Sequence, residues 1–473
     1  GSSNTINYAS AANLTAQYTL AAEPTVQATI SSLTPQSNGN LVINFDAGTG
    51  GTGRMVVVRQ GSAVDFTPDD ANTSYDVGTN FSSGTKYGVG SDNKVVYVST
   101  GSSITVSGLT PATVYHVAVF EYNGTTTPPR NYLTTLGAGN TGNATTFATQ
   151  PSTAVSNIAM TGNTTTSISL SWTNGNGAGR IVVARESATT NEYAADGTDY
   201  SYSSSSFTDA GNGTTGTGNI IVYKGTGNSV TVTDLTPGTA YRFYAYEYNG
   251  SSNTINYTYD ANLPVRYTLS LEPTAHAASF TATATSSTNI DFNFSAANTI
   301  TNATGYLILR KPTAFTGSDY PQDRNAYSLG ASIGGATVTK IITDGSKTSD
   351  SYTSNADETW YFLLVPFNWD GANGATRNYY TDPTIPTSNT STPSGVSDVV
   401  AVASSSPATI SSIINDAAPL TSSTGVQVWQ ITVRDGGASM NDADVLPTKV
   451  SGITFTTASG NGVTWNTAIK TAA

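Results

Sequence analysis

A long internal repeat constrains the fold of this chain more than any other feature. The stretch LTPATVYHVAVFEYNG ends at Gly124, and the similar stretch LTPGTAYRFYAYEYNG ends at Gly250, 126 residues later. A weaker copy, DETWYFLLVPFNWDG, ends at Gly371. Since this period is the length of a whole domain, we expect a tandem array of similar modules.

Prolines mark the expected module ends. Pro24, Pro151, Pro273 and Pro393 follow successive copies of the repeat. Proline has no N–H to give to a sheet, so it suits the place where one sheet ends. The opening GSSNTINY returns at Gly250–Tyr257, which makes the first residues the end of a module. The predicted organisation is a C-terminal strand or strands of an incomplete module (1–22), three modules (23–149, 150–271, 272–392) and a partial β-sandwich of a different type (393–473).

Within a module the pattern predicts strands. In SISLSWT, Ile168, Leu170 and Trp172 alternate with serines, as in a half-buried strand. Further runs rich in Val, Ile, Thr and Tyr follow, separated by Gly and Asn turns, with no helical block. Two packed antiparallel sheets are the usual solution for such a chain. The predicted fold class is all-β, with tandem immunoglobulin-like β-sandwich modules in an elongated array.

Charge and composition exclude several classes of function. The chain has 19 Lys and Arg against 31 Asp and Glu, a net charge of −12, and no basic stripe that could bind nucleic acid. No apolar run approaches the length of a membrane span, so we expect no membrane insertion. The absence of cysteine excludes disulfides and thiol catalysis.

One stretch resembles a known family. Leu235, Pro237, Thr239 and Tyr241 match the Leu-x-Pro-x-Thr-x-Tyr pattern of fibronectin type III domains, and module one matches it with Leu109, Pro111, Thr113 and Tyr115. The third copy keeps Thr359 and Tyr361 but lacks the Leu and Pro. The resemblance implies a tyrosine corner, in which the ring enters the core and the hydroxyl bonds to backbone upstream, at Tyr115, Tyr241 and Tyr361.

A second resemblance is narrower. Long modules with VVVR, VVY, EYNG and a later Asn-Tyr pair look like those of large surface and adhesion proteins exported by the bacterial type IX secretion system. It implies an extracellular or cell-surface location, and a non-enzymatic structural or adhesive segment that forms a stalk or fibre. The expected partners are other copies or further modules of the same chain, and surface glycans or proteins.

Two alternative functions stay open. The first is a spacer or sugar-binding accessory region of an exported enzyme. The second is a subunit of an extracellular filament in which residues 1–22 of one copy complete region 393–473 of the next. An enzyme within this chain is not expected, because its only histidines, His116 and His276, share no motif with Ser, Asp or Glu.

The loop RDGGASMNDAD is the candidate metal site. Asp435, Asn441, Asp442 and Asp444 offer the hard oxygen ligands that calcium prefers. Their spacing is not that of an EF-hand, and a solvated turn is the alternative. Calcium is the one cofactor that we consider. Smaller acidic loops recur at Asp65–Asp76, Asp196–Asp199 and Asp319–Asp323, which indicates shared structure.

A row of tyrosines is the candidate contact surface. If Tyr241 and the alternate residues after it face the core, then Tyr244, Tyr246 and Tyr248 face outward. Exposed aromatic rows stack on sugars or anchor protein partners. The alternative is packing against neighbours on the same face of the sheet.

Overall fold

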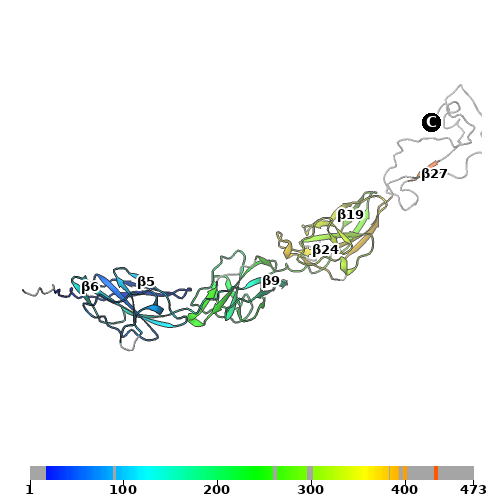
Figure 1. Cartoon of the computed structure of the whole chain (residues 1–473). Coiled ribbons are helices and arrows are strands. Elements are labelled where there is room, and N and C mark those ends of the chain that lie inside the picture. Colours follow the sequence, from blue (N-terminus) through cyan, green and yellow to red (C-terminus); the bar gives the residue numbers. More distant parts are fainter. Residues whose placement is uncertain are drawn as a thin grey trace, which may run out of the picture. The chain divides into compact units, whose positions relative to one another are not determined.

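The structure of the chain is a computed structural model (Figure 1). It describes residues 17–88, 92–258, 264–295, 302–382 and 384–393, and the backbone of 398–401 and 431–434. The expected calcium loop and the opening GSSNTINY lie outside these residues. By its contacts the chain forms two units, Gly1–Leu269 and Ser270–Ala473, and each is described by itself.

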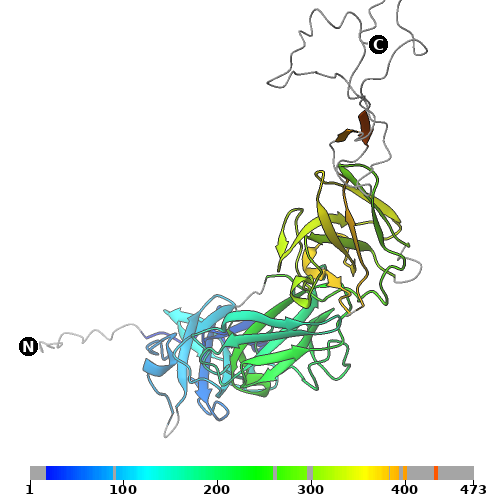
Figure 2. The same cartoon turned by 90° about the vertical axis from the view of Figure 1, so that its right-hand side faces the viewer.

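Three β-sandwiches account for the described residues up to 393. Each pairs a three-stranded antiparallel sheet with a larger one, and Figures 1 and 2 show strands throughout, joined by loops. The regular helices in these ranges are single 3₁₀ turns, η1 (Phe81–Ser83), η2 (Ser252–Thr254), η3 (Gly317–Asp319) and η4 (Gly374–Thr376). The all-β fold expected from the sequence is therefore confirmed.

Module one holds β1 to β8. The small sheet has the order β1-β2-β5 and the large sheet the order β4-β3-β6-β7, with β8 also paired to β6. The bounds are β1 (Thr29–Pro35), β2 (Leu41–Asp46), β3 (Gly53–Gln60), β4 (Lys94–Ser99), β5 (Ser103–Val106), β6 (Val114–Thr126), β7 (Pro129–Tyr132) and β8 (Thr141–Thr145).

Module two repeats this arrangement with β9 to β17. Its small sheet has the order β14-β10-β9, and its large sheet β12-β13-β11-β15-β16, with β17 also on β15. The bounds are β9 (Ser156–Asn163), β10 (Ile168–Thr173), β11 (Gly179–Glu186), β12 (Thr214–Gly216), β13 (Asn219–Gly225), β14 (Ser229–Val232), β15 (Ala240–Asn249), β16 (Asn256–Thr258) and β17 (Arg266–Tyr267).

Module three follows with β18 to β26. The orders are β18-β19-β23 and β21-β22-β20-β24-β25, with β26 on β24. The bounds are β18 (Thr281–Ala284), β19 (Asn289–Asn293), β20 (Gly305–Lys311), β21 (Ser332–Ile333), β22 (Ala336–Ile342), β23 (Ser349–Thr353), β24 (Thr359–Asn368), β25 (Asn378–Tyr379) and β26 (Thr387–Ser391). Beyond it, β27 (Asp398–Ala401) pairs antiparallel with β28 (Ile431–Arg434).

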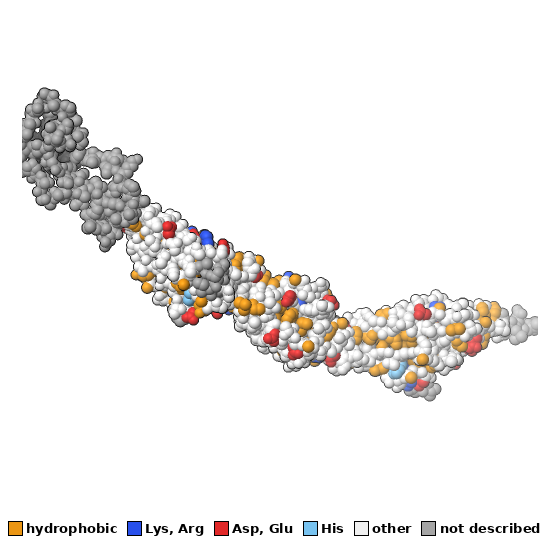
Figure 3. All heavy atoms as spheres, turned by 180° about the vertical axis from the view of Figure 1, so that it is seen from behind, with side chains coloured by type: hydrophobic (Ala, Val, Ile, Leu, Met, Phe, Trp, Pro, Cys, Tyr) orange, Lys and Arg blue, Asp and Glu red, His pale blue; other side chains and the backbone are white. Residues whose placement is uncertain are grey.

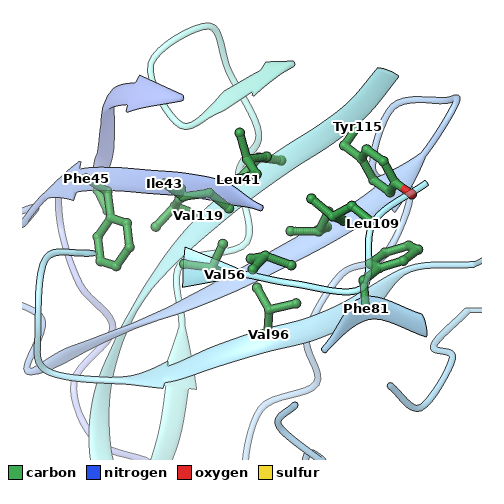
Figure 4. Close-up of a cluster of buried hydrophobic side chains, with 13 residues drawn as sticks. Leu41, Ile43, Phe45, Val56, Phe81, Val96, Leu109, Tyr115 and Val119 are labelled. Carbon is green, nitrogen blue, oxygen red and sulfur yellow. The ribbon is translucent and has the colours of Figure 1, made fainter. Parts of the chain in front are cut away.

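The first core of each module lies between its two sheets. In module two, Ile168, Leu170 and Trp172 are buried there as their alternation predicts, together with Tyr241 and Phe243. Figure 4 shows the equivalent cluster of module one, where Leu41, Ile43 and Phe45 of β2 meet Val56 of β3 and Val119 of β6.

A second core covers the outer face of each large sheet. The long connection between β3 and β4 folds back over this face, as do its counterparts between β11 and β13 and between β20 and β22. In module two it contributes Tyr200, which packs with Ile181 and Val183 of β11 and with Tyr246 of β15. Matching clusters exist in modules one and three. The central strands are therefore buried on both faces, which explains their continuous apolar runs, such as MVVV in β3.

Candidate functional site

Two tyrosine corners have the geometry that the resemblance implies. The Tyr115 ring is fully buried, and its hydroxyl accepts a hydrogen bond from the Thr110 N–H at 2.8 Å. The Tyr241 ring is equally buried, and its hydroxyl accepts from the Thr236 N–H at 2.9 Å. In Figure 4 the Tyr115 ring points into the cluster beside Leu109 and Phe81. Each corner fixes the start of the long central strand against the loop before it.

In module three, Trp360 occupies the corner position that the sequence analysis assigned to Tyr361. Pairing along β20 and β24 places Trp360 where modules one and two have their corner tyrosines, so strand alternation turns Tyr361 to the other face. The Trp360 Nε1–H donates to Glu358 Oε2 at 2.9 Å and to Ser354 Oγ at 3.1 Å. Hydrogen bonds from Asn355, Ser354 and Trp360 lower the pKa of Glu358 to about 2. A charged hydrogen-bond network thus replaces the tyrosine corner.

The tyrosines expected on an exposed stripe are covered. Tyr244 and Tyr246 are 8% and 2% exposed, and Tyr248 is half-buried against the same cluster. They do face away from the inter-sheet core, as alternation requires, but Tyr257 packs 6.4 Å from Tyr246 and 5.8 Å from Tyr248, measured between ring centroids. These residues therefore belong to the second core and offer no stacking platform for a sugar.

The Glu of the EYNG motif forms a buried ion pair that the sequence did not indicate. Glu247 is fully buried and lies 3.0 Å from the Nε of Arg180, and both of its oxygens also accept from glycine N–H groups, those of Gly175 and Gly177. Arg54 and Glu121 form the matching pair in module one, at 3.3 Å. Arg54 also donates to carbonyl oxygens of the loop after β4, and Arg180 to the loop after β13, so each pair ties three segments together.

Module three has replaced both members of this pair. Tyr306 and Pro366 stand opposite each other at the positions of Arg180 and Glu247. The Tyr306 hydroxyl donates to the Gly345 carbonyl at 3.3 Å, inside the fully buried core. The same place in the fold is therefore filled either by a charged pair or by an uncharged one.

The Asn-Tyr pair that recurs after each EYNG copy anchors the start of its module. Its asparagine donates a side-chain N–H to a backbone carbonyl of the segment that leads into the module. These bonds are Asn131 to Ala21 at 2.9 Å, Asn256 to Ala148 at 2.8 Å and Asn378 to Ser270 at 2.8 Å. The contact is the same in all three modules, so the lead-in segment is part of the folded structure.

The tyrosine of each pair holds the long connection in place. Its backbone N–H donates to an aspartate of that connection, and its hydroxyl donates to a carbonyl two residues further on. The acceptors are Asp70 and Asn72 for Tyr132, Asp196 and Thr198 for Tyr257, and Asp323 and Asn325 for Tyr379. Burial raises the pKa of Tyr132 and of Tyr379 to about 12.

The recurring acidic loops therefore have a structural role. The residue after each of these aspartates has a left-handed backbone, with φ of 64° at Ala71, 77° at Gly197 and 70° at Arg324. Burial raises the pKa of Asp196 and Asp323. We call the three connections caps, defined by 61–93, 187–218 and 312–335. Within the described ranges, no group of three or more His, Asp or Glu side chains could hold a metal ion.

The remaining candidates are outside the described residues or isolated. The possible calcium ligands Asp435, Asn441, Asp442 and Asp444 are not described, so the calcium site stays a prediction. His116 lies on β6, paired with Arg59, and the His276 ring packs at a tilt against Tyr380 with 4.6 Å between ring centroids. In the described part of the chain, no helix is both long and apolar enough to span a membrane.

Comparison with known proteins adds little to this description. No protein-family model matches the chain, and no curated protein matches it. One solved structure that matches is described as "Crystal structure of chicken CNTN1 FN1-FN3 domains". The match covers 78% of this chain and 100% of that one, with 12% sequence identity and a TM-score of 0.27. A score this low carries no argument. The class of protein, an array of fibronectin type III-like β-sandwiches, follows from the paired sheets and the tyrosine corners.

Proposed function

We propose that this chain is a non-enzymatic structural segment of a secreted bacterial surface protein, which forms a stalk or fibre and supports adhesion. The observation that carries the proposal is the anchored lead-in, repeated at Ala21, Ala148 and Ser270. A segment that holds each module to the peptide before it suits a chain that must transmit tension. The scarcity of charged side chains, visible in Figure 3, is in keeping with an exported protein.

The alternative of a sugar-binding accessory region has lost its main support, because Tyr244 and Tyr246 are buried beneath a cap. A spacer in an exported enzyme is compatible with the same anchored modules. The strand-exchanged filament depends on residues 1–22 and 393–473, most of which lie outside the described residues, so it stays a prediction. Export by the type IX system stays a proposal based on sequence resemblance.

Single-molecule force spectroscopy on the whole chain tests the structural role. Each module should unfold as a separate event that releases about 40 nm of chain, the extended length of a module of this size. Asn256→Ala removes the bonds to the Ala148 and Ser37 carbonyls and should lower the force of one of these events. Asn378→Ala removes only the bond to the Ser270 carbonyl and should do the same in module three, while Asn163→Ala, which removes a bond to Tyr267 elsewhere in module two, serves as the control. Unfolding at forces too low to separate the events would contradict a role under tension.

Surface exposure can be tested independently. Antibodies against the purified chain should label intact source cells, and protease added outside the cells should remove that label. Labelling only after the cells are broken would contradict the proposed location, whatever the mechanical result.

A further inference from the structure

The peptide between modules one and two leaves no free linker. The Phe147 carbonyl accepts the Ala112 N–H of module one at 3.1 Å. The next residue, Ala148, donates its own N–H to the Thr254 carbonyl of module two at 2.8 Å. Neighbouring domains usually move relative to one another when a flexible linker joins them. Here consecutive residues are bound to successive modules, so bending is confined to the link between these two residues.

A direct contact beside this link fastens the two modules together. The Asn256 side-chain NH₂ donates to the Ala148 carbonyl at 2.8 Å and to the Ser37 carbonyl of module one at 2.9 Å. Asn256 is fully buried, so water does not compete for these hydrogen bonds. The equivalent Asn131 and Asn378 donate to carbonyls of their own lead-in segments. The Ser37 contact is therefore an addition to the shared lead-in bond.

The acceptor lies on an ordered turn of module one, residues 36–40, which joins β1 to β2. The Gln36 N–H donates to the Asn40 carbonyl at 2.9 Å, and the Gly39 N–H donates to the Gln36 carbonyl at 3.0 Å. Gly39 has a φ of 83°, a left-handed conformation that glycine adopts readily. The Ser37 carbonyl is therefore held in place by its own module, which lowers the entropy cost of the contact.

The cap of module two closes on the same link. A β-carbon at position 197 would lie 3.0 Å from Cε1 of Phe147; Gly197 has none, which lets the Phe147 ring pack directly on the cap backbone. Modules one and two also fall within one unit, Gly1–Leu269, when the chain is divided by its contacts. The link is therefore held by the chain itself, by the Asn256 amide and by an aromatic ring.

We propose that modules one and two form one rigid body, and that Asn256 is the latch that fastens the Ser37 turn to module two. A latch beside the link removes the remaining freedom, because swinging either module must break a buried hydrogen bond. This joint is a property of the fold and does not depend on the cellular location of the chain.

Double electron–electron resonance on the whole chain tests the proposal. The chain contains no cysteine, so spin labels attach specifically to introduced thiols. Thr105→Cys and Thr231→Cys, at matching exposed positions of β5 and β14, report the distance between the two modules. Thr105→Cys with Ser62→Cys, both exposed in module one, gives the reference width for a single rigid body. The pair that spans the joint should give a distance distribution as narrow as the reference pair.

Two variants disrupt the latch from opposite sides. Asn256→Ala removes both amide hydrogen bonds. Gly39→Ile changes the shape of the turn and leaves the Asn256–Ala148 bond in place, because a β-branched residue avoids a φ of 83°. No atom lies within 4 Å of a β-carbon at position 39, so this substitution acts through the backbone. Both variants should lose the narrow peak across the joint, while the reference pair stays narrow.

Each variant has a matched control that should keep the narrow peak. Asn378→Ala makes the same change at the equivalent asparagine of module three. Gly61→Ile places the same side chain at a φ of 73°, again with no atom within 4 Å, but away from the joint.

Three results would overturn the proposal. A broad distribution across the joint without any latch substitution would mean that the two modules move independently. A narrow peak that survives Asn256→Ala would show that Asn256 is not the latch. Broadening in Asn256→Ala but not in Gly39→Ile would assign the effect to the lead-in bond and not to the Ser37 contact.

Discussion

The buried Arg180–Glu247 ion pair should contribute strongly to the stability of module two, and its removal gives the sharpest test. Arg180 is 3% exposed and Glu247 is fully buried, so neither charge has access to water. The Glu247 oxygens accept four hydrogen bonds: from the Gly175 N–H at 2.8 Å, the Gly177 N–H at 3.1 Å, and the Nε and Nη2 of Arg180 at 3.0 and 3.2 Å. Glu247→Gln leaves one acceptor oxygen and places an NH₂ group against remaining donors. It also leaves the Arg180 charge without a counter-ion.

Breaking a buried pair in this way costs about 3–5 kcal/mol. Native-state hydrogen exchange followed by mass spectrometry should therefore show that amides of β10, β11 and β15 exchange roughly 100- to 10,000-fold faster than in wild type. Module one carries the intact Arg54–Glu121 pair in the same molecule, so its peptides are the internal control.

A double variant separates the pair from its parts. Arg180→Met with Glu247→Leu removes both charges, as Tyr306 and Pro366 do in module three. Replacing a buried pair by apolar groups is often neutral or stabilising, but here the Gly175 and Gly177 N–H groups lose their acceptor. Exchange in the double variant should therefore be slower than in Glu247→Gln and remain faster than in wild type. Unchanged exchange in Glu247→Gln, or a double variant as unstable as the single one, would refute the reasoning.

Three further predictions concern the corner, an ion pair and a cap. Tyr241→Phe removes the acceptor of the partly buried Thr236 N–H and should cost about 1 kcal/mol in module two, measured by the same exchange experiment. Lys311 Nζ lies 2.6 Å from Asp319 Oδ2. Burial raises the pKa of Asp319, but hydrogen bonds outweigh it and lower that pKa to about 2; their donors are Lys311, the Thr316 N–H and hydroxyl, and the Gly335 N–H. Because this folded pKa lies below the ordinary value, the stabilisation of about 2 kcal/mol is present above pH 4 and is lost as the pH falls towards 2; Asp319→Asn should abolish that dependence in urea titrations of module three. Burial raises the pKa of Asp196, so ionisation of its carboxyl group opposes folding as the pH rises above the ordinary pKa of Asp, and the full effect is present above the raised pKa of the folded state. Asp196→Asn should therefore stabilise module two more at pH 7 than at pH 4, which melting temperatures at the two pH values will measure.

Alternation and the repeat were sufficient to predict the strands, and the resemblance to fibronectin type III domains implied two of the three corners. Ile168, Leu170 and Trp172 could be assigned to a core because a strand turns successive side chains to opposite faces. The prediction for Tyr361 was wrong because the third copy lacks the Leu and Pro that align the other two copies with the family pattern. An alignment error of one residue moves a side chain from the core face of a strand to its opposite face. The Trp360 ring, next to it in the sequence, was the correct choice.

The caps could not be predicted from their own residues, which are mostly polar and without periodicity. The indication lay in the strands beneath them. MVVV in β3 and IVVA in β11 are continuous apolar runs, which a strand exposed on one face does not have. The buried ion pairs left a trace of a different kind. Arg and Glu occur together 67 residues apart in modules one and two, and both are missing in module three.

The anchored lead-in changes what counts as one excisable unit. A fragment cut at Pro151 would lack Ala148, whose carbonyl accepts from Asn256, and Thr149, whose carbonyl accepts from Asn249. The Asn256 and Asn249 side chains would then lose these acceptors. Expression fragments should therefore start several residues before each proline, and a gene duplication that yields a working copy must carry the end of the preceding unit with it.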